Sequence, residues 1–207
     1  AGTAAGAAAL AGKGRSVAVA ALLPLTGVML TVDTLSGVFL SVIGAVGIAV
    51  GVYGIGYARN GLDGRGVQAM EPLFVAAMLL VPAAGSVGKF LVGWELVALT
   101  SLLLVLAEHS HRAEVASAAR WYAVMTHLGF VAIMIGLLVL TAHAVNDSFP
   151  ALRVAAATLS PTTAGLVFAL TLIGFASKAG ILPLHAWLPR AHPEAPSHVS
   201  ALMSAAM

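Results

Sequence analysis

Long apolar stretches separated by short polar segments follow one another from residue 35 to the end of the chain. Most of them approach the about 20 residues that an α-helix needs to cross the hydrocarbon core of a bilayer. Their bounds predict helices at about 35–58, 70–84, 88–107, 118–145 and 163–181, and the start of a further helix at residue 197. The pattern therefore predicts an all-α polytopic membrane protein with a transmembrane bundle over residues 35–207.

Residues 1–34 have a different pattern. Their alanine-rich start favours the end of a preceding helix. Apolar, β-branched segments at 16–19 and 28–32 flank a turn with proline and glycine at 24–27, which predicts a short β-hairpin, with a transmembrane helix as the competing interpretation. The chain starts without methionine or the basic region of a signal peptide, and it stops inside an apolar run, so we expect an internal piece of a longer protein.

Composition excludes several classes of protein. Charged residues make up 9% of the chain, against about 25% in an ordinary soluble domain, and the mean hydropathy is +1.00. A net charge of +2 is too small and too scattered for nucleic-acid binding. The absence of cysteine excludes disulfides, thiolate-bound metals and cysteine-ligated iron–sulfur clusters, and no haem or flavin motif is visible. We therefore expect neither a bound cofactor nor a catalytic residue.

Arginine gathers at one end of the predicted bundle, in and beside the loops at 59–65 and 108–114. By the positive-inside rule this end faces the cytoplasm, and the β-hairpin is then extracytoplasmic. Lys13 and Arg15, beside the hairpin, run against the rule.

Lys178 is the most informative charged residue. It lies near the end of the apolar segment at 163–181, and Gly180 and Pro183 follow it closely. An ammonium group at the centre of a bilayer costs at least about 3 kcal/mol, and broken helices beside such charges form the ion sites of transporters. The position therefore predicts a role in moving charge through a membrane. The alternative is a lysine at a helix end whose ammonium group reaches the membrane surface.

Glu95 lies well inside the predicted helix at 88–107. It has no charged neighbour one turn away on that helix, so an opposite charge on another helix would be needed to keep it ionised. Lys178 is the natural partner if the two helices pack together. The alternative is a glutamate near a helix N-terminus that the helix dipole favours.

His127, inside the predicted helix at 118–145, is a candidate proton relay because imidazole titrates near neutral pH, although it could equally just hydrogen-bond a neighbour. His185, His192 and His198 follow Lys178 in a segment with several prolines, as candidate relay or loop residues. Their spacing and the intervening prolines differ from the i, i+4 pairs that bind zinc on a helix, so we expect no metal.

Several segments together resemble the proton-conducting antiporter-like family. This family includes large membrane subunits of respiratory complex I, of Mrp-type sodium/proton antiporters, and of hydrogenase 4 and formate hydrogenlyase, and the resemblance is closest to the hydrogenase subunit. The segments occur in the family's order, and the last of them reads APSHVSALM. They lie at 32–36, 94–95, 126–129, 177–189 and 195–203.

The resemblance implies the N-terminal part of an antiporter-like helix bundle with a discontinuous helix that carries Lys178, and it implies that Glu95 and Lys178 are the family's coupled pair. The function implied is a proton-translocating membrane subunit of an NADH-quinone-oxidoreductase-like or hydrogenase-4-like complex in the plasma membrane of a prokaryotic-type cell. The implied partners are other membrane and peripheral subunits, the lipid bilayer and protons. An Mrp-type cation/proton antiporter without redox coupling and a purely structural member of the family are the alternatives.

Overall fold

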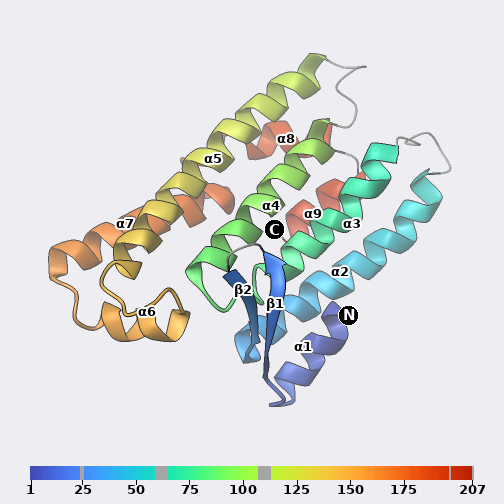
Figure 1. The fold of residues 1–207 in the computed structure, drawn as a ribbon. Helices are drawn as coiled ribbons and strands as arrows, with labels where there is room; N and C mark the ends of the chain where they lie inside the picture. The colour runs from blue at the N-terminus through green and yellow to red at the C-terminus, as the bar shows by residue number, and fades with distance from the viewer. Residues whose placement is uncertain (24–25, 59–64, 107–112, 196, 207) are drawn as a thin grey trace.

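The computed structural model describes residues 1–23, 26–58, 65–106, 113–195 and 197–206. Long helices form the bundle, and short helices and a β-hairpin pack beside or between them (Figure 1). The long helices are α2 (Thr34–Ala58), α3 (Arg65–Leu80), α4 (Val87–Val105), α5 (Ala113–Thr141) and α7 (Pro161–Lys178). The other elements are α1 (Gly2–Leu10), β1 (Arg15–Leu23), β2 (Thr26–Val32), α6 (Phe149–Ala156), α8 (Leu188–Glu194) and α9 (Ser197–Ala206).

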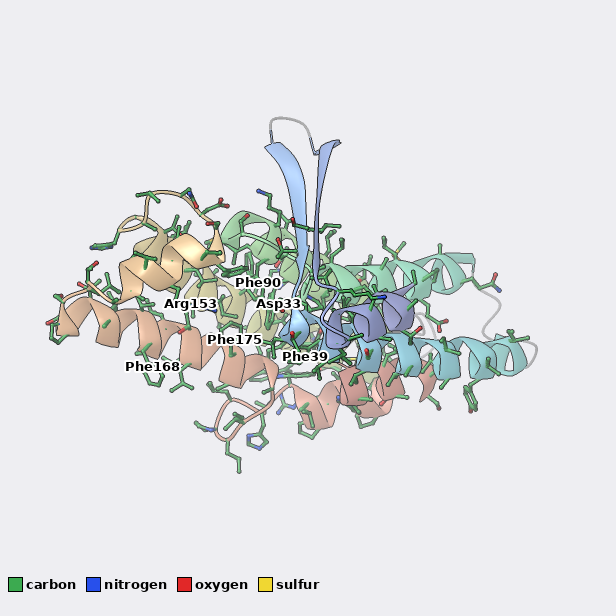
Figure 2. All side chains as sticks on the ribbon, turned by 90° about the horizontal axis from the view of Figure 1, so that it is seen from below. Asp33, Phe39, Phe90, Arg153, Phe168 and Phe175 are labelled. Carbon is green, nitrogen blue, oxygen red and sulfur yellow. The ribbon has the colours of Figure 1, made fainter. Side chains whose placement is uncertain are left out.

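The N-terminal part forms the predicted hairpin, and the competing transmembrane helix is wrong. The strands β1 and β2 pair antiparallel, with Arg15 opposite Val32, and the tip at residues 24–25 lies outside the described residues. The base of the hairpin joins the bundle, because the Thr31 N–H donates to the Ala83 carbonyl at 2.9 Å. The rest of the hairpin projects away from the helices (Figure 2).

Within the described residues, four helical segments are long and apolar enough to cross a membrane: Thr34–Gly56, Val87–Val105, Val115–Thr141 and Pro161–Lys178. Many of their large apolar side chains are exposed, as expected of surfaces that contact lipid. In the bundle, α7 lies along α5, α4 packs against both α5 and α3, and α9 packs against α2 (Figure 1).

Two predicted loops contain short helices, which corrects the sequence prediction. The loop predicted at 146–161 contains α6, where the Ser148 side chain accepts a hydrogen bond from the Ala151 N–H as an N-cap. The segment after Lys178 contains α8, in which Pro189 occupies the first turn, where a missing N–H costs nothing. Other bounds shift by a few residues: α3 occupies 65–80 instead of 70–84, and α5 and α7 end at Thr141 and Lys178. The predicted cytoplasmic loops lie mostly outside the described residues.

Candidate proton-relay site

Lys178 is the last residue of α7, and its side chain is buried with 9% exposed. The helix ends there because Gly180 adopts a φ of 67°, which favours glycine and turns the chain away from the helix axis. The Lys178 ammonium donates to the Tyr122 hydroxyl at 3.4 Å and lies 6.0 Å from the centre of the Trp94 ring. It therefore points into the bundle, unlike a lysine that extends from a helix end to the membrane surface.

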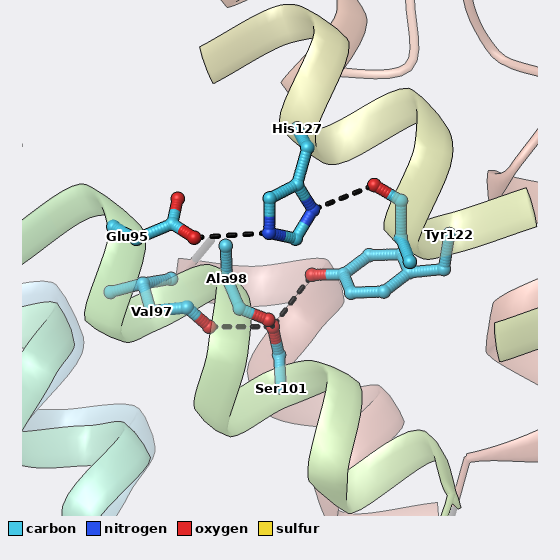
Figure 3. Close-up of polar contacts among 7 residues, drawn as sticks. Glu95, Val97, Ala98, Ser101, Tyr122 and His127 are labelled. Carbon is cyan, nitrogen blue, oxygen red and sulfur yellow. Dashed lines mark hydrogen bonds and ion pairs between the residues drawn. The ribbon is translucent and has the colours of Figure 1, made fainter. Parts of the chain in front are cut away.

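A second hydroxyl extends this contact into α4. The Tyr122 and Ser101 hydroxyl oxygens are 2.6 Å apart, and both side chains are fully buried (Figure 3). Ser101 Oγ in turn donates to the Val97 carbonyl at 2.6 Å. When Lys178 is an ammonium group it can only donate to Tyr122, so the tyrosine proton is directed to Ser101 and the serine proton to the carbonyl. The hydroxyl dipoles of Tyr122 and Ser101 therefore point the same way, with their oxygen ends toward the buried ammonium group.

Glu95 on α4 contacts His127 on α5. The Glu95 Oε1 and His127 Nε2 atoms are 3.0 Å apart, and the two side chains are 26% and 42% exposed (Figure 3). The other imidazole nitrogen, Nδ1, lies 2.8 Å from the Ala123 carbonyl oxygen and must carry a hydrogen, since that oxygen only accepts. The contact between Nε2 and Oε1 therefore holds one proton, on either the imidazole or the carboxyl group.

The expected direct pairing of Glu95 with Lys178 is replaced by separate contacts. The two side chains interact electrostatically, but within the described part of the chain their closest polar partners are His127 and Tyr122, respectively. Both partners belong to α5, which packs between α4 and α7. The Trp94 and Phe175 rings, 5.4 Å apart at their centres, bring α4 and α7 into contact near Lys178. Glu95, His127 and Lys178 thus belong to one cluster without a direct ion pair of the acid and the lysine.

The three later histidines occupy different environments. His192 Nδ1 lies 3.0 Å from the Ser200 hydroxyl, and burial lowers the pKa of His192. His198 Nε2 lies 3.4 Å from a Glu71 carboxylate oxygen on α3. His185 is half-buried. Among the described residues, no group of three or more histidine, aspartate or glutamate side chains could hold a metal ion.

A cavity of about 1060 Å³ extends from Lys178 to the hairpin end of the bundle. Trp94 and Phe90 line it near the lysine, and Asp33 and Arg153 line it at the other end. Figure 2 shows Asp33, Phe90 and Arg153 from this side. Its walls are mainly apolar, so the few polar side chains at its ends are the groups that water or an ion would meet first.

Sequence reasoning missed Tyr122 and Ser101. A tyrosine or serine within an apolar helix is common, and neither residue lies one helical turn from Glu95 or His127. Only the crossing of α4, α5 and α7 brings their hydroxyl groups to Lys178.

Comparisons with known proteins identify the family to which this chain is similar. The family model described as NADH:quinone oxidoreductase/Mrp antiporter, TM, matches residues 84–207, which include Glu95, His127 and Lys178. An uncharacterized protein of Mycobacterium tuberculosis is 58% identical over 95% of this chain and 30% of its own length. Hydrogenase-4 component B of Escherichia coli is 37% identical over 86% of this chain and 26% of its own length. The chain therefore spans less than a third of these curated relatives.

Solved structures share the fold. A chain of the Mrp complex from Dietzia sp. superposes with a TM-score of 0.77 at 21% identity, over 97% of this chain and 37% of its own. A chain of the membrane-bound sulfane sulfur reductase, an archaeal respiratory membrane complex, gives a TM-score of 0.76 at 20% identity, over 96% of this chain and 40% of its own.

Proposed function

The chain belongs to the family of NADH:quinone oxidoreductase and Mrp antiporter membrane subunits, and we propose that it carries protons through Glu95, His127 and Lys178 as part of a larger membrane complex. It is an integral membrane protein with antiporter-like architecture. The proposed location is the plasma membrane of a prokaryotic cell, and the proposed partners are other membrane and peripheral subunits that carry out the redox chemistry.

The observation that supports this proposal best is the buried Lys178 ammonium beside the acid–imidazole contact. Charged side chains at membrane depth are costly, and they usually mark ion or proton pathways. Lys178 is 9% exposed and has a single hydroxyl as its close polar partner within the described residues. A buried lysine with few polar partners is therefore a candidate carrier of a transported proton.

A change in the protonation of Glu95 would change its electrostatic interaction with the Lys178 ammonium group. Transfer of the shared proton from His127 Nε2 to Glu95 Oε1 neutralises the carboxylate, which interacts electrostatically with the ammonium group. Loss of that opposite charge favours release of the lysine proton. In this mechanism a change at a partner subunit acts on the cluster by loosening one contact, and the proton moves as a result.

The alternative function is an Mrp-type exchange of a monovalent cation for protons without redox coupling. The 37% identity to hydrogenase-4 component B favours the redox-coupled role. Transport that requires sodium, by a purified complex with no electron-transfer subunit, would support the antiporter instead.

The test is Lys178→Ala in the full chain within its complex, reconstituted into liposomes. We expect proton translocation to fall to background while electron transfer by the partner subunits continues. Lys13→Ala is the matched control, because Lys13 is exposed in the turn before the hairpin. Unchanged translocation in Lys178→Ala, with electron transfer intact, would overturn the proposal.

A further inference from the structure

A second acid–imidazole contact lies elsewhere in the bundle, between α3 and α9. His198 Nε2 and Glu71 Oε2 are 3.4 Å apart, and the two side chains are only 4% and 19% exposed. This contact is more deeply buried than that of Glu95 with His127. Glu71 lies in an apolar helix, and an ionisable group in such a position indicates function by default.

The space around Glu71 is shaped by a glycine of α2. A Cβ atom at Gly54 would lie 3.7 Å from both carboxylate oxygens, so α2 closes over the acid without a side chain of its own. Phe74, one turn after Glu71, and Leu202, one turn after His198, are completely buried in the adjoining core. The pair is thus enclosed by helices on several sides.

Several of the other titratable groups on the elements packed against this pair have contacts of their own. His192 bonds to Ser200, Arg190 stacks on the Trp121 ring, and Glu95 contacts His127. The titratable groups described on α2, α4 and α8, which pack against α3 or α9, are Tyr53, Lys89, Glu95, Arg190, His192 and Glu194.

We propose that Glu71 and His198 form a second proton-binding site, separate from the cluster of Glu95, His127 and Lys178. The site takes up one proton from water and releases it again. The proton resides on the imidazole Nε2 or on the carboxyl Oε2, and its uptake converts a pair with one negative charge into a neutral pair. This uptake removes the net charge, and the proton belongs to the pair as a unit and not to one of the two groups alone.

Two observations favour a proton over a metal or sodium ion as the ligand. The pair offers one carboxylate and one imidazole, whereas metal sites need three or more protein ligands, and no such group exists in the described residues. The Nε2–Oε2 distance of 3.4 Å also leaves no room for an ion between the two atoms.

Infrared difference spectroscopy of the full chain in lipid, recorded between about pH 5 and pH 8, tests the proposal directly. We expect pH-dependent bands of the Glu71 carboxyl or carboxylate group that disappear in Glu71→Gln and persist in Glu95→Gln. A Glu71→Gln spectrum identical to that of the parent protein would overturn the proposal. This readout is independent of translocation, so it can fail or succeed separately from the proposed function.

A second variant keeps the test decisive if Glu71→Gln does not fold. His198→Gln leaves the carboxyl group and removes the imidazole, and we expect the midpoint of the carboxyl band to move by about one pH unit. His143→Gln is the matched control, because His143 is exposed in the turn after α5 and, among the described residues, its imidazole contacts only the Val139 carbonyl oxygen. A midpoint that stays the same in His198→Gln contradicts the pairing.

Discussion

The two halves of the proposed relay differ in their burial. The Glu95–His127 contact is partly exposed, whereas Tyr122 and Ser101 are sealed inside the bundle and Lys178 reaches only the end of the cavity, and these three residues form the sealed half. In the exposed half, part of the His127 imidazole lies at the surface of the bundle. The sealed half depends on a few fixed hydroxyl dipoles, and losing any one of them leaves a buried polar group unsatisfied. In the proposed relay, the exposed half would supply protons and the sealed half would hold a charge.

After Lys178→Ala, the largest effect is expected from removing the charge in the exposed half. Glu95→Gln keeps the size of the side chain but can neither take the proton of His127 nor interact with Lys178 as a carboxylate. We expect proton translocation to fall roughly 100-fold, the scale of a lost proton-transfer group. Liposome acidification measures it. A rate near that of the parent protein would remove Glu95 from the relay.

In the sealed half, Tyr122→Phe removes a single hydroxyl group. The ring keeps its edge-on packing with Trp187, 5.1 Å between centres, so the core is preserved. Lys178 and Ser101 each lose a partner, and we expect stability to fall by about 1–3 kcal/mol and translocation to fall roughly tenfold. Tyr53→Phe, at an exposed tyrosine of α2, is the control. Loss of stability without any loss of translocation would make Tyr122 a packing residue only.

The position of the sealed half depends on close packing of α7 against α5. A Cβ atom at Gly174 would meet the Gly129 carbonyl oxygen at 2.5 Å and also the Ile133 side chain. Gly174→Ala should therefore lower stability by about 1–3 kcal/mol through overpacking, as seen in thermal unfolding. Gly165 lies on the same helix with open space around it, so Gly165→Ala should not destabilise. Equal behaviour of the two variants would contradict this packing.

The smallest effect is expected at Asp33, a carboxylate outside the relay. Its oxygen accepts a hydrogen bond from the Ser36 N–H at 2.8 Å, and this bond lowers the pKa of Asp33. A lowered pKa stabilises the fold above the unfolded-state value, and the contribution disappears as pH falls through the folded-state value. Asp33→Asn keeps the N-cap without the charge.

Because Asp33 is exposed, the change should be below about 1 kcal/mol. Thermal unfolding near pH 7 and near pH 3 should show a smaller difference in Asp33→Asn than in the parent protein. An equal difference would mean that Asp33 does not contribute to the pH dependence.

The sequence predicted the features that depend on local pattern. Long apolar runs predicted the helices, and β-branched residues around Pro24 and Gly27 predicted the hairpin. Glu95, His127 and Lys178 stood out because charged or imidazole groups are rare in apolar helices. The α6 helix was missed although Ser148 provides an N-cap, because its short polar surroundings are typical of a loop.

Features that depend on helix crossings could not be predicted in this way. The contact of Lys178 with Tyr122, and that of His198 with Glu71, each join residues more than fifty positions apart. Nothing in the local sequence of α3 links Glu71 to a histidine in α9.

The most direct test of the relay is whether its two halves act as one unit. His127→Gln and Tyr122→Phe each change one half, and each should reduce proton translocation roughly tenfold. If the halves are coupled, the double variant should also be reduced only about tenfold. A reduction of about 100-fold, the product of two independent losses, would contradict the account.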